Sequence, residues 1–129
     1  MSKSIQDWTN ECYRLAKQKG WHEKDREPGT IHMLMVSEIA EATEEARKGT
    51  PPIYADSECE VPGEPARVTD LDYIREQEEK PEGELIELAD CVIRIFDYCG
   101  KMNWDLEKAI ELKHNYNKSR PQRHGGKAF

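Results

Sequence analysis

Residues 84–99 of this chain read ELIELADCVIRIFDYC, and this stretch decides the fold class. At 100° per residue, its apolar side chains cover most of the circumference of a helix, which is typical of a buried helix. The polar side chains form one strip along that helix, made of Glu84, Glu87, Asp90, Arg94 and Asp97. Carboxylates directed at a core are costly unless they are paired or bind a cation, so this strip is the first candidate for chemistry.

Apolar periodicity and its punctuation predict four helices, at about residues 4–19, 30–48, 81–100 and 103–118. Ser4 and Asp7 resemble a capping box at the start of the first helix, and Gly100 is expected to end the third. Asn103 or Asp105 can cap the last helix. No segment shows sustained alternation with a period of two, so strands are not expected. The sequence therefore predicts an all-α class, with the four helices in a bundle.

The negative charge of the chain is concentrated in residues 49–83. This segment holds ten of the 26 acidic residues, three of the 19 basic residues and five of the seven prolines. Such a composition indicates an inserted connector rather than core, with room for one short helix at residues 70–75. A basic tail follows at about residues 119–129. We expect a single domain over residues 1–129 that carries this insert and this tail.

Charge and hydropathy exclude several classes of function. A formal net charge of −7 argues against binding to duplex nucleic acid or to an anionic membrane. No apolar run approaches the roughly 20 residues of a membrane span, and no signal-peptide core is present at the N-terminus. The four cysteines, at positions 12, 59, 91 and 99, lack zinc-ligand spacing. Free thiols in a cytoplasmic protein are therefore expected.

Two acid pairs are embedded in apolar stripes. Glu38 and Glu41 lie three residues apart within the stripe of the 30–48 helix, and Glu87 and Asp90 repeat that spacing on the 81–100 helix. Four oxygen ligands without sulfur or nitrogen suit Mg²⁺ or Mn²⁺. A solvated acidic face is the alternative, but the position of both pairs inside apolar stripes favours a metal site.

Polar side chains also continue the apolar stripe of the last helix. Lys113 and Asn117 occupy that stripe, and Arg120 follows on nearly the same side. Directed towards a cation held by carboxylates, these three residues would bind a polyphosphate. The alternative is a lysine that extends into solvent and interacts favourably with the helix C-terminus. Arg94 and Asp97, which continue the acid strip, are further candidates for substrate binding.

Three stretches then carry a resemblance: SEIAE at 37–41, ELAD at 87–90, and KHNYNKSRP at 113–121 with its RHGGK tail. Together they resemble the MazG-type all-α nucleoside triphosphate pyrophosphohydrolases, whose pattern is EExxE on one helix and ExxD on a later one. The resemblance implies hydrolysis of a nucleoside triphosphate, often a deoxy or non-canonical one, to the monophosphate and pyrophosphate. It implies Mg²⁺ as cofactor and a homodimer or homotetramer whose bundles complete one another's sites. The implied Mg²⁺ ligands are Glu38, Glu41, Glu87 and Asp90, and the implied phosphate contacts are Lys113, Asn117 and Arg120.

The sequence departs from this pattern in two places. Ser37 stands where the family has its first glutamate, an acid proposed in some members to activate the attacking water. Glu84, one turn before Glu87, is our candidate base. The expected catalytic set is therefore Glu38, Glu41 and Glu84. The alternative is that Glu84 pairs with a basic residue. The segment between Glu41 and Glu87 is also longer than in the compact family version. A non-catalytic nucleotide-binding or partner-binding helical module with a structural metal-binding cluster is the alternative function.

Overall fold

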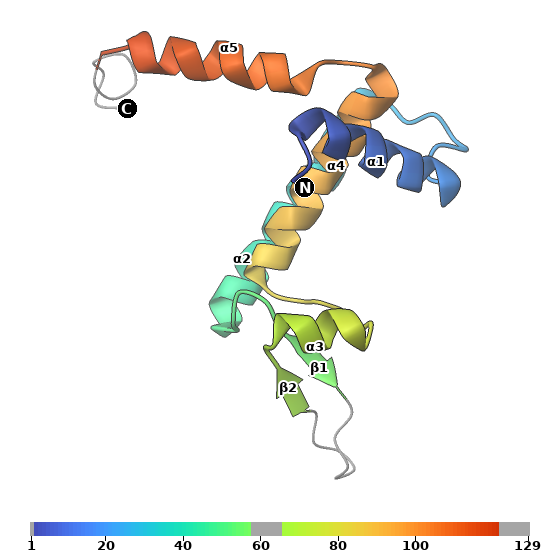
Figure 1. Ribbon diagram of the computed structural model, residues 1–129, viewed down its shortest axis with the longest axis vertical. Helices are drawn as coiled ribbons and strands as arrows, with labels where there is room; N and C mark the ends of the chain where they lie inside the picture. The colour runs from blue at the N-terminus through green and yellow to red at the C-terminus, as the bar shows by residue number, and fades with distance from the viewer. Residues whose placement is uncertain (1, 58–65, 122–129) are drawn as a thin grey trace. The chain divides into compact units, whose positions relative to one another are not determined.

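The computed structural model describes residues 2–57 and 66–121, in which five helices and one pair of short strands are found (Figure 1). They follow in the order α1 (Ile5–Gln18), α2 (Pro28–Lys48), β1 (Ala55–Ser57), β2 (Ala66–Val68), α3 (Leu71–Glu76), α4 (Glu84–Met102) and α5 (Leu106–Ser119). The described residues are mostly helical, which agrees with the predicted all-α class. Cys59 and most of the predicted basic tail lie outside the described residues. Within the described residues, no helix has both the length and the apolar character that a membrane span requires.

The predicted cap at the start of α1 is confirmed, and the alternatives for α5 are resolved. The Ser4 hydroxyl accepts a hydrogen bond from the Asp7 N–H, and the Asp7 carboxylate accepts one from the Ser4 N–H. Asp105 caps α5, where its carboxylate accepts a hydrogen bond of 3.0 Å from the N–H of Lys108. These bonds satisfy amide groups that would otherwise lack a partner at the first turn of each helix.

The predicted end of the third helix at Gly100 is wrong, because α4 continues to Met102. Asn103 ends it with φ at 56°, a left-handed conformation that asparagine adopts more readily than most residues. The following residue, Trp104, donates its N–H to the carbonyl of Cys99 at 3.0 Å, which closes the last turn. Gly100 is therefore a residue of the helix interior.

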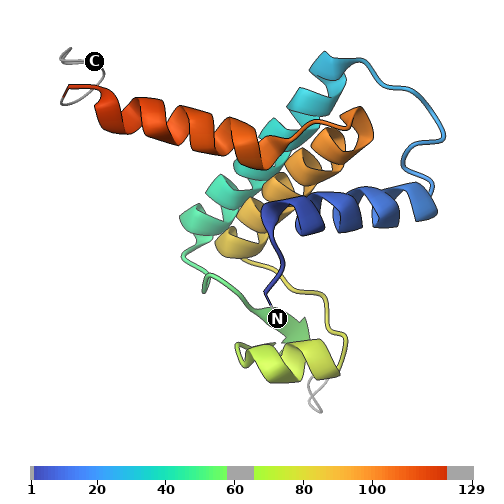
Figure 2. The same cartoon turned by 45° about the horizontal axis from the view of Figure 1, so that its top comes forward.

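The expectation that strands are absent is wrong for the insert. β1 and β2 form an antiparallel hairpin that pairs Asp56 with Arg67, and three residues per strand are too few to show periodicity. The insert also differs from a plain connector, because Tyr54, Ala55 and Ile74 are at most 5% exposed. The predicted short helix at residues 70–75 is confirmed as α3, which lies beside β1 in Figures 1 and 2.

The chain divides into two compact units, Met1–Glu23 with Phe96–Phe129 and Lys24–Ile95. In the second unit, α2 runs alongside the first three turns of α4 (Figure 2). Glu41 neighbours Glu87 there, while Glu38 contacts Arg94 further along α4, so the two helices run antiparallel. In the first unit, α1 contacts α5 and also packs against α4 at Gly100.

Gly100 allows a close backbone approach between α1 and α4, and we expect Gly100→Ala to disrupt it. A Cβ atom there would lie 2.6 Å from the Cβ of Tyr13 and 2.9 Å from the carbonyl oxygen of Thr9. Relieving this overlap should lower the free energy of unfolding by about 1–3 kcal/mol in urea denaturation. Gly29→Ala in α2 is the control, because no heavy atom lies within 4 Å of its added Cβ. Equal stability of the two variants would contradict the close contact.

Candidate metal centre

Three of the four predicted ligands come together between α2 and α4. One carboxylate oxygen from each of Glu38, Glu41 and Glu87 lies within 4.8 Å of the other two. Glu38 is buried, Glu87 is half-buried and Glu41 is exposed, so this acid trio opens to solvent at one side. The spacing of three residues puts Glu38 and Glu41 on one face of α2, opposite Glu87.

The apolar pattern of α2 explains why Glu38 is buried. Ala42, one turn later, is 4% exposed, and Leu34, one turn earlier, is half-buried. Glu38 lies between them on the same face and is 7% exposed, as its position inside the stripe predicts. Burial of a carboxylate is costly without a compensating charge or hydrogen bond. This position therefore needs a cationic partner.

Arg94 supplies such a partner from α4. Its Nε donates a hydrogen bond of 2.9 Å to Oε1 of Glu38, and the side chains of Arg94 and Glu38 are 27% and 9% exposed, respectively. The sequence placed Arg94 among the substrate contacts, whereas the structure places it on the buried acid of the trio. The second oxygen of the Glu38 carboxylate could coordinate a cation.

The other acids of the site hold their protons unusually well. Burial raises the pKa of Glu87 to about 7, and the adjacent carboxylates of Glu41 and Glu38 contribute to the shift. Burial also raises the pKa of Asp90; the charge of Glu38 adds to this shift, and the nearby Arg94 opposes it. In both cases negative charge is crowded into a partly desolvated space. A cation bound among these groups would relieve the crowding.

The raised pKa of Glu87 gives the metal-free chain a defined pH dependence. Between its ordinary value of 4.5 and about 7, the folded chain binds more protons than the unfolded chain. The contribution of Glu87 to the unfolding free energy therefore falls as pH rises through that window. In EDTA we expect Glu87→Gln to match the wild type near pH 4.5 and to exceed its stability at pH 8 by about 1 kcal/mol, a figure reduced for solvent screening.

Urea denaturation of both proteins at several pH values measures this difference. Excess Mg²⁺ at pH 8 should raise the stability of the wild type more than that of Glu87→Gln, because only the wild type retains all three carboxylate ligands. A stability difference that stays constant from pH 4.5 to pH 8 in EDTA would show that Glu87 is not perturbed as described.

The donor set fits a hard divalent cation. All three donors are carboxylate oxygens, which are the ligands of Mg²⁺ and Mn²⁺ rather than of softer metals. Oxygens around an octahedral Mg²⁺ lie about 3–4 Å apart, so atoms within 4.8 Å of one another need only a small closure. Asp90 lies one turn after Glu87 and is not part of the trio. Its place in the ligand set remains a prediction.

Ser37 and Glu84 also lie on the helices that carry the trio. The Ser37 hydroxyl donates a hydrogen bond of 2.7 Å to the carbonyl of Leu34, so it is engaged with its own helix. Ser37 is exposed and offers no acid in this position. Glu84 is the first residue of α4 and is also exposed, one turn before Glu87. Its role as a base remains a prediction.

The remaining predicted residues belong to the first unit. Lys113 and Arg120 both place their cationic groups over the ring of Tyr116, at 5.0 Å and 5.5 Å from its centroid. The Asn117 carbonyl accepts a hydrogen bond from the Arg120 N–H at 3.3 Å. The acid trio belongs to the second unit. Participation of these α5 residues in one site with the trio therefore remains a prediction.

Asp97 contacts His22, a residue that the sequence pattern does not indicate. Asp97 lies 2.7 Å from Nε2 of His22, and the His22 ring meets Tyr13 edge-on at 5.2 Å between centroids. No spacing signal could reveal this pair, because 75 positions separate its members. The prediction that Asp97 contacts substrate has no support from this pairing.

Comparisons with protein-family models, with curated proteins and with solved structures found no match to this chain.

Proposed function

We propose that this chain is a Mg²⁺-dependent nucleoside triphosphate pyrophosphohydrolase of the MazG-like kind. The observation that carries the proposal is the acid trio, in which carboxylate oxygens from two helices converge. Its members are three of the four Mg²⁺ ligands implied by the resemblance, and Glu41 and Glu87, which come from different helices, are 46 positions apart in the sequence. Mn²⁺ is an alternative metal with the same ligand preference.

The proposed reaction divides the work between the cation and the side chains. A bound Mg²⁺ would supply positive charge against the phosphate oxygens and would polarise a water molecule. Glu38 and Glu41 would hold the cation from α2, and the hydrogen bond from Arg94 orients the Glu38 carboxylate. Glu84 is proposed to take the proton from the attacking water, since Ser37 has no carboxylate to do so. Lys113, Asn117 and Arg120 are proposed to bind the triphosphate.

Exposed apolar side chains support the proposed assembly of this chain into a helical bundle completed by a homodimer or homotetramer. Val36 and Ile39 on α2 are 53% and 45% exposed, and Ile93 on α4 is 46% exposed. On α5, Leu112 is 76% exposed, and the helix has no buried residue. Apolar area of this kind is typical of helices that pack against another subunit.

A second candidate is a nucleotide-binding or partner-binding module without turnover. The observation that favours it is Ser37, whose hydroxyl is bonded to the Leu34 carbonyl where the family has an acid. Such a module would bind Mg²⁺ with a triphosphate but would release no pyrophosphate.

Pyrophosphate release from a panel of the eight canonical ribo- and deoxyribonucleoside triphosphates tests the proposal. We expect Mg²⁺-dependent release of pyrophosphate and nucleoside monophosphate in equal amounts from at least one substrate, and none in EDTA. Binding of a non-hydrolysable triphosphate without release from any substrate would favour the non-catalytic module. Release of inorganic phosphate alone would contradict the proposed position of cleavage.

A further inference from the structure

The two ends of the insert are joined by a backbone clasp, made of residues 52–54 and 82–85. Tyr54 and Glu82 exchange both of their backbone hydrogen bonds, with N···O distances of 2.9 Å and 2.7 Å. The N–H of Leu85 donates to the carbonyl of Pro52 at 3.1 Å. The clasp thus closes the insert immediately after the end of α2 and immediately before the acids of α4.

Gly83 makes this close approach possible. Its φ is 119°, a conformation that residues with a Cβ rarely adopt. A Cβ atom at Gly83 would lie 2.2 Å from the carbonyl oxygen of Pro52 and 2.8 Å from that of Pro51. These are backbone atoms rather than the ends of flexible side chains, so the two segments would have to separate.

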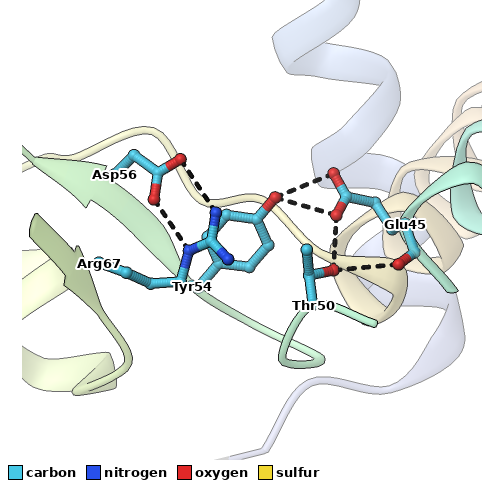
Figure 3. Close-up of polar contacts among 5 residues, drawn as sticks. All are labelled: Glu45, Thr50, Tyr54, Asp56 and Arg67. Atoms are coloured by element: carbon cyan, nitrogen blue, oxygen red, sulfur yellow. Dashed lines mark hydrogen bonds and ion pairs between the residues drawn. The ribbon is translucent and has the colours of Figure 1, made fainter. Parts of the chain in front are cut away.

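A side-chain network ties the clasp to the last turns of α2 (Figure 3). The Tyr54 hydroxyl donates to the carboxylate of Glu45, with distances of 2.9 Å and 3.1 Å to its two oxygens, and the Thr50 hydroxyl lies 2.6 Å from the same group. Arg67 lies over the Tyr54 ring at 4.2 Å and pairs with Asp56 on the neighbouring strand. Tyr54 is 4% exposed, so this anchor is largely shielded from solvent.

The clasp is also continuous with the turns that carry the acids. Glu45 follows Glu41 by one turn of α2, and the carbonyl of Gly83 accepts a hydrogen bond of 3.1 Å from the N–H of Glu87. One tightly bonded segment therefore connects the helix end beside Glu41 with the helix start that bears Glu87.

We infer that the clasp, with Gly83 and Tyr54 as its positioning residues, sets the separation of Glu41 and Glu87 and so the affinity of the acid trio for a divalent cation. This inference rests on the proposed function, because it takes the trio to be a metal site. Neither residue is a proposed ligand; each acts through the helix that it holds. Residues that hydrogen-bond metal ligands directly commonly change metal affinity about 10–100-fold when replaced, and residues that act through a ligand's helix are expected near the lower end of that range.

Binding of Mn²⁺ to the purified full-length chain, followed by the electron paramagnetic resonance signal of free Mn²⁺, tests the inference. We expect Gly83→Ala to weaken Mn²⁺ binding about tenfold or more. Gly49→Ala is the matched control, because Gly49 also has a positive φ, of 68°, at the end of α2 but has no heavy atom within 4 Å of an added Cβ. It should keep the wild-type affinity within about twofold.

A second pair of variants guards against misfolding of Gly83→Ala. Tyr54→Phe removes only the hydroxyl that bonds Glu45, and Tyr73→Phe makes the same change on α3, where the side chain is 42% exposed. Tyr54→Phe should weaken Mn²⁺ binding several-fold with its helical circular dichroism unchanged, whereas Tyr73→Phe should not. Wild-type affinity in folded Tyr54→Phe and Gly83→Ala would overturn the inference and leave the proposed function standing. Failure of the wild type to bind Mn²⁺ would overturn both.

Discussion

Glu41→Gln is expected to lower kcat for triphosphate hydrolysis at least about a hundredfold while the fold stays intact. Glu41 is exposed, and glutamine keeps its shape, so little packing is at risk. The substitution removes one of the three proposed carboxylate ligands, and the proposed transition state would then lose charge compensation at the transferring phosphoryl group. Steady-state hydrolysis at saturating Mg²⁺, together with circular dichroism, measures both parts of this expectation.

The matched control for this variant is Glu44→Gln. Glu44 lies one turn from Glu41 on the same helix, is exposed, and pairs with Arg47 at 3.0 Å rather than with the trio. We expect Glu44→Gln to retain wild-type kcat within about twofold. Near-normal turnover of Glu41→Gln at saturating Mg²⁺ would remove Glu41 from the ligand set.

Arg94→Met is expected to have the largest effect on stability. The Glu38 side chain that it pairs with is only 9% exposed, so loss of the guanidinium leaves a buried charge uncompensated. The expected decrease in unfolding free energy is about 3 kcal/mol in EDTA, where no metal replaces the lost charge. Arg75→Met is the control, because its pair with Asp72 is exposed and should contribute less than about 1 kcal/mol.

The double variant Glu38→Gln with Arg94→Met separates the pair from the other contacts of Arg94. Most of the lost stability should return in the double variant, because no buried charge remains unpaired. Urea denaturation of the four members of this cycle gives the coupling energy directly. A coupling energy near zero would show that Arg94 does not stabilise Glu38.

The helices could be predicted because their determinants are local. The capping pair of Ser4 and Asp7 and the short helix α3 follow from residues close in sequence. The sequence places the end of α4 two residues too early, because glycine commonly ends a helix, whereas Gly100 lies inside α4, where an added Cβ would overlap with α1. The hairpin could not be predicted because each strand has only three residues, too few to show an alternating pattern.

In the candidate site, too, the features set by local sequence could be predicted and the long-range contacts could not. Period and spacing predict that Glu38 and Glu41 both lie inside the apolar stripe of α2. Glu38 is buried as expected, whereas Glu41 is exposed. The partner of Glu38 could not be predicted, because Arg94 lies 56 positions away and its reach depends on the register between α2 and α4. We infer that the backbone hydrogen bonds around Gly83 help to hold that register, and these hydrogen bonds cannot be predicted from the sequence.

We propose that Glu38, Glu41 and Glu87 together hold one divalent cation. Anomalous diffraction at the manganese absorption edge, from a crystal of the full-length chain equilibrated with Mn²⁺, would locate this cation. We expect an anomalous peak within coordination distance of oxygens from all three carboxylates, and loss of that peak in Glu41→Gln. The absence of a peak among these oxygens, in a crystal at the same Mn²⁺ concentration, would rule out this metal site.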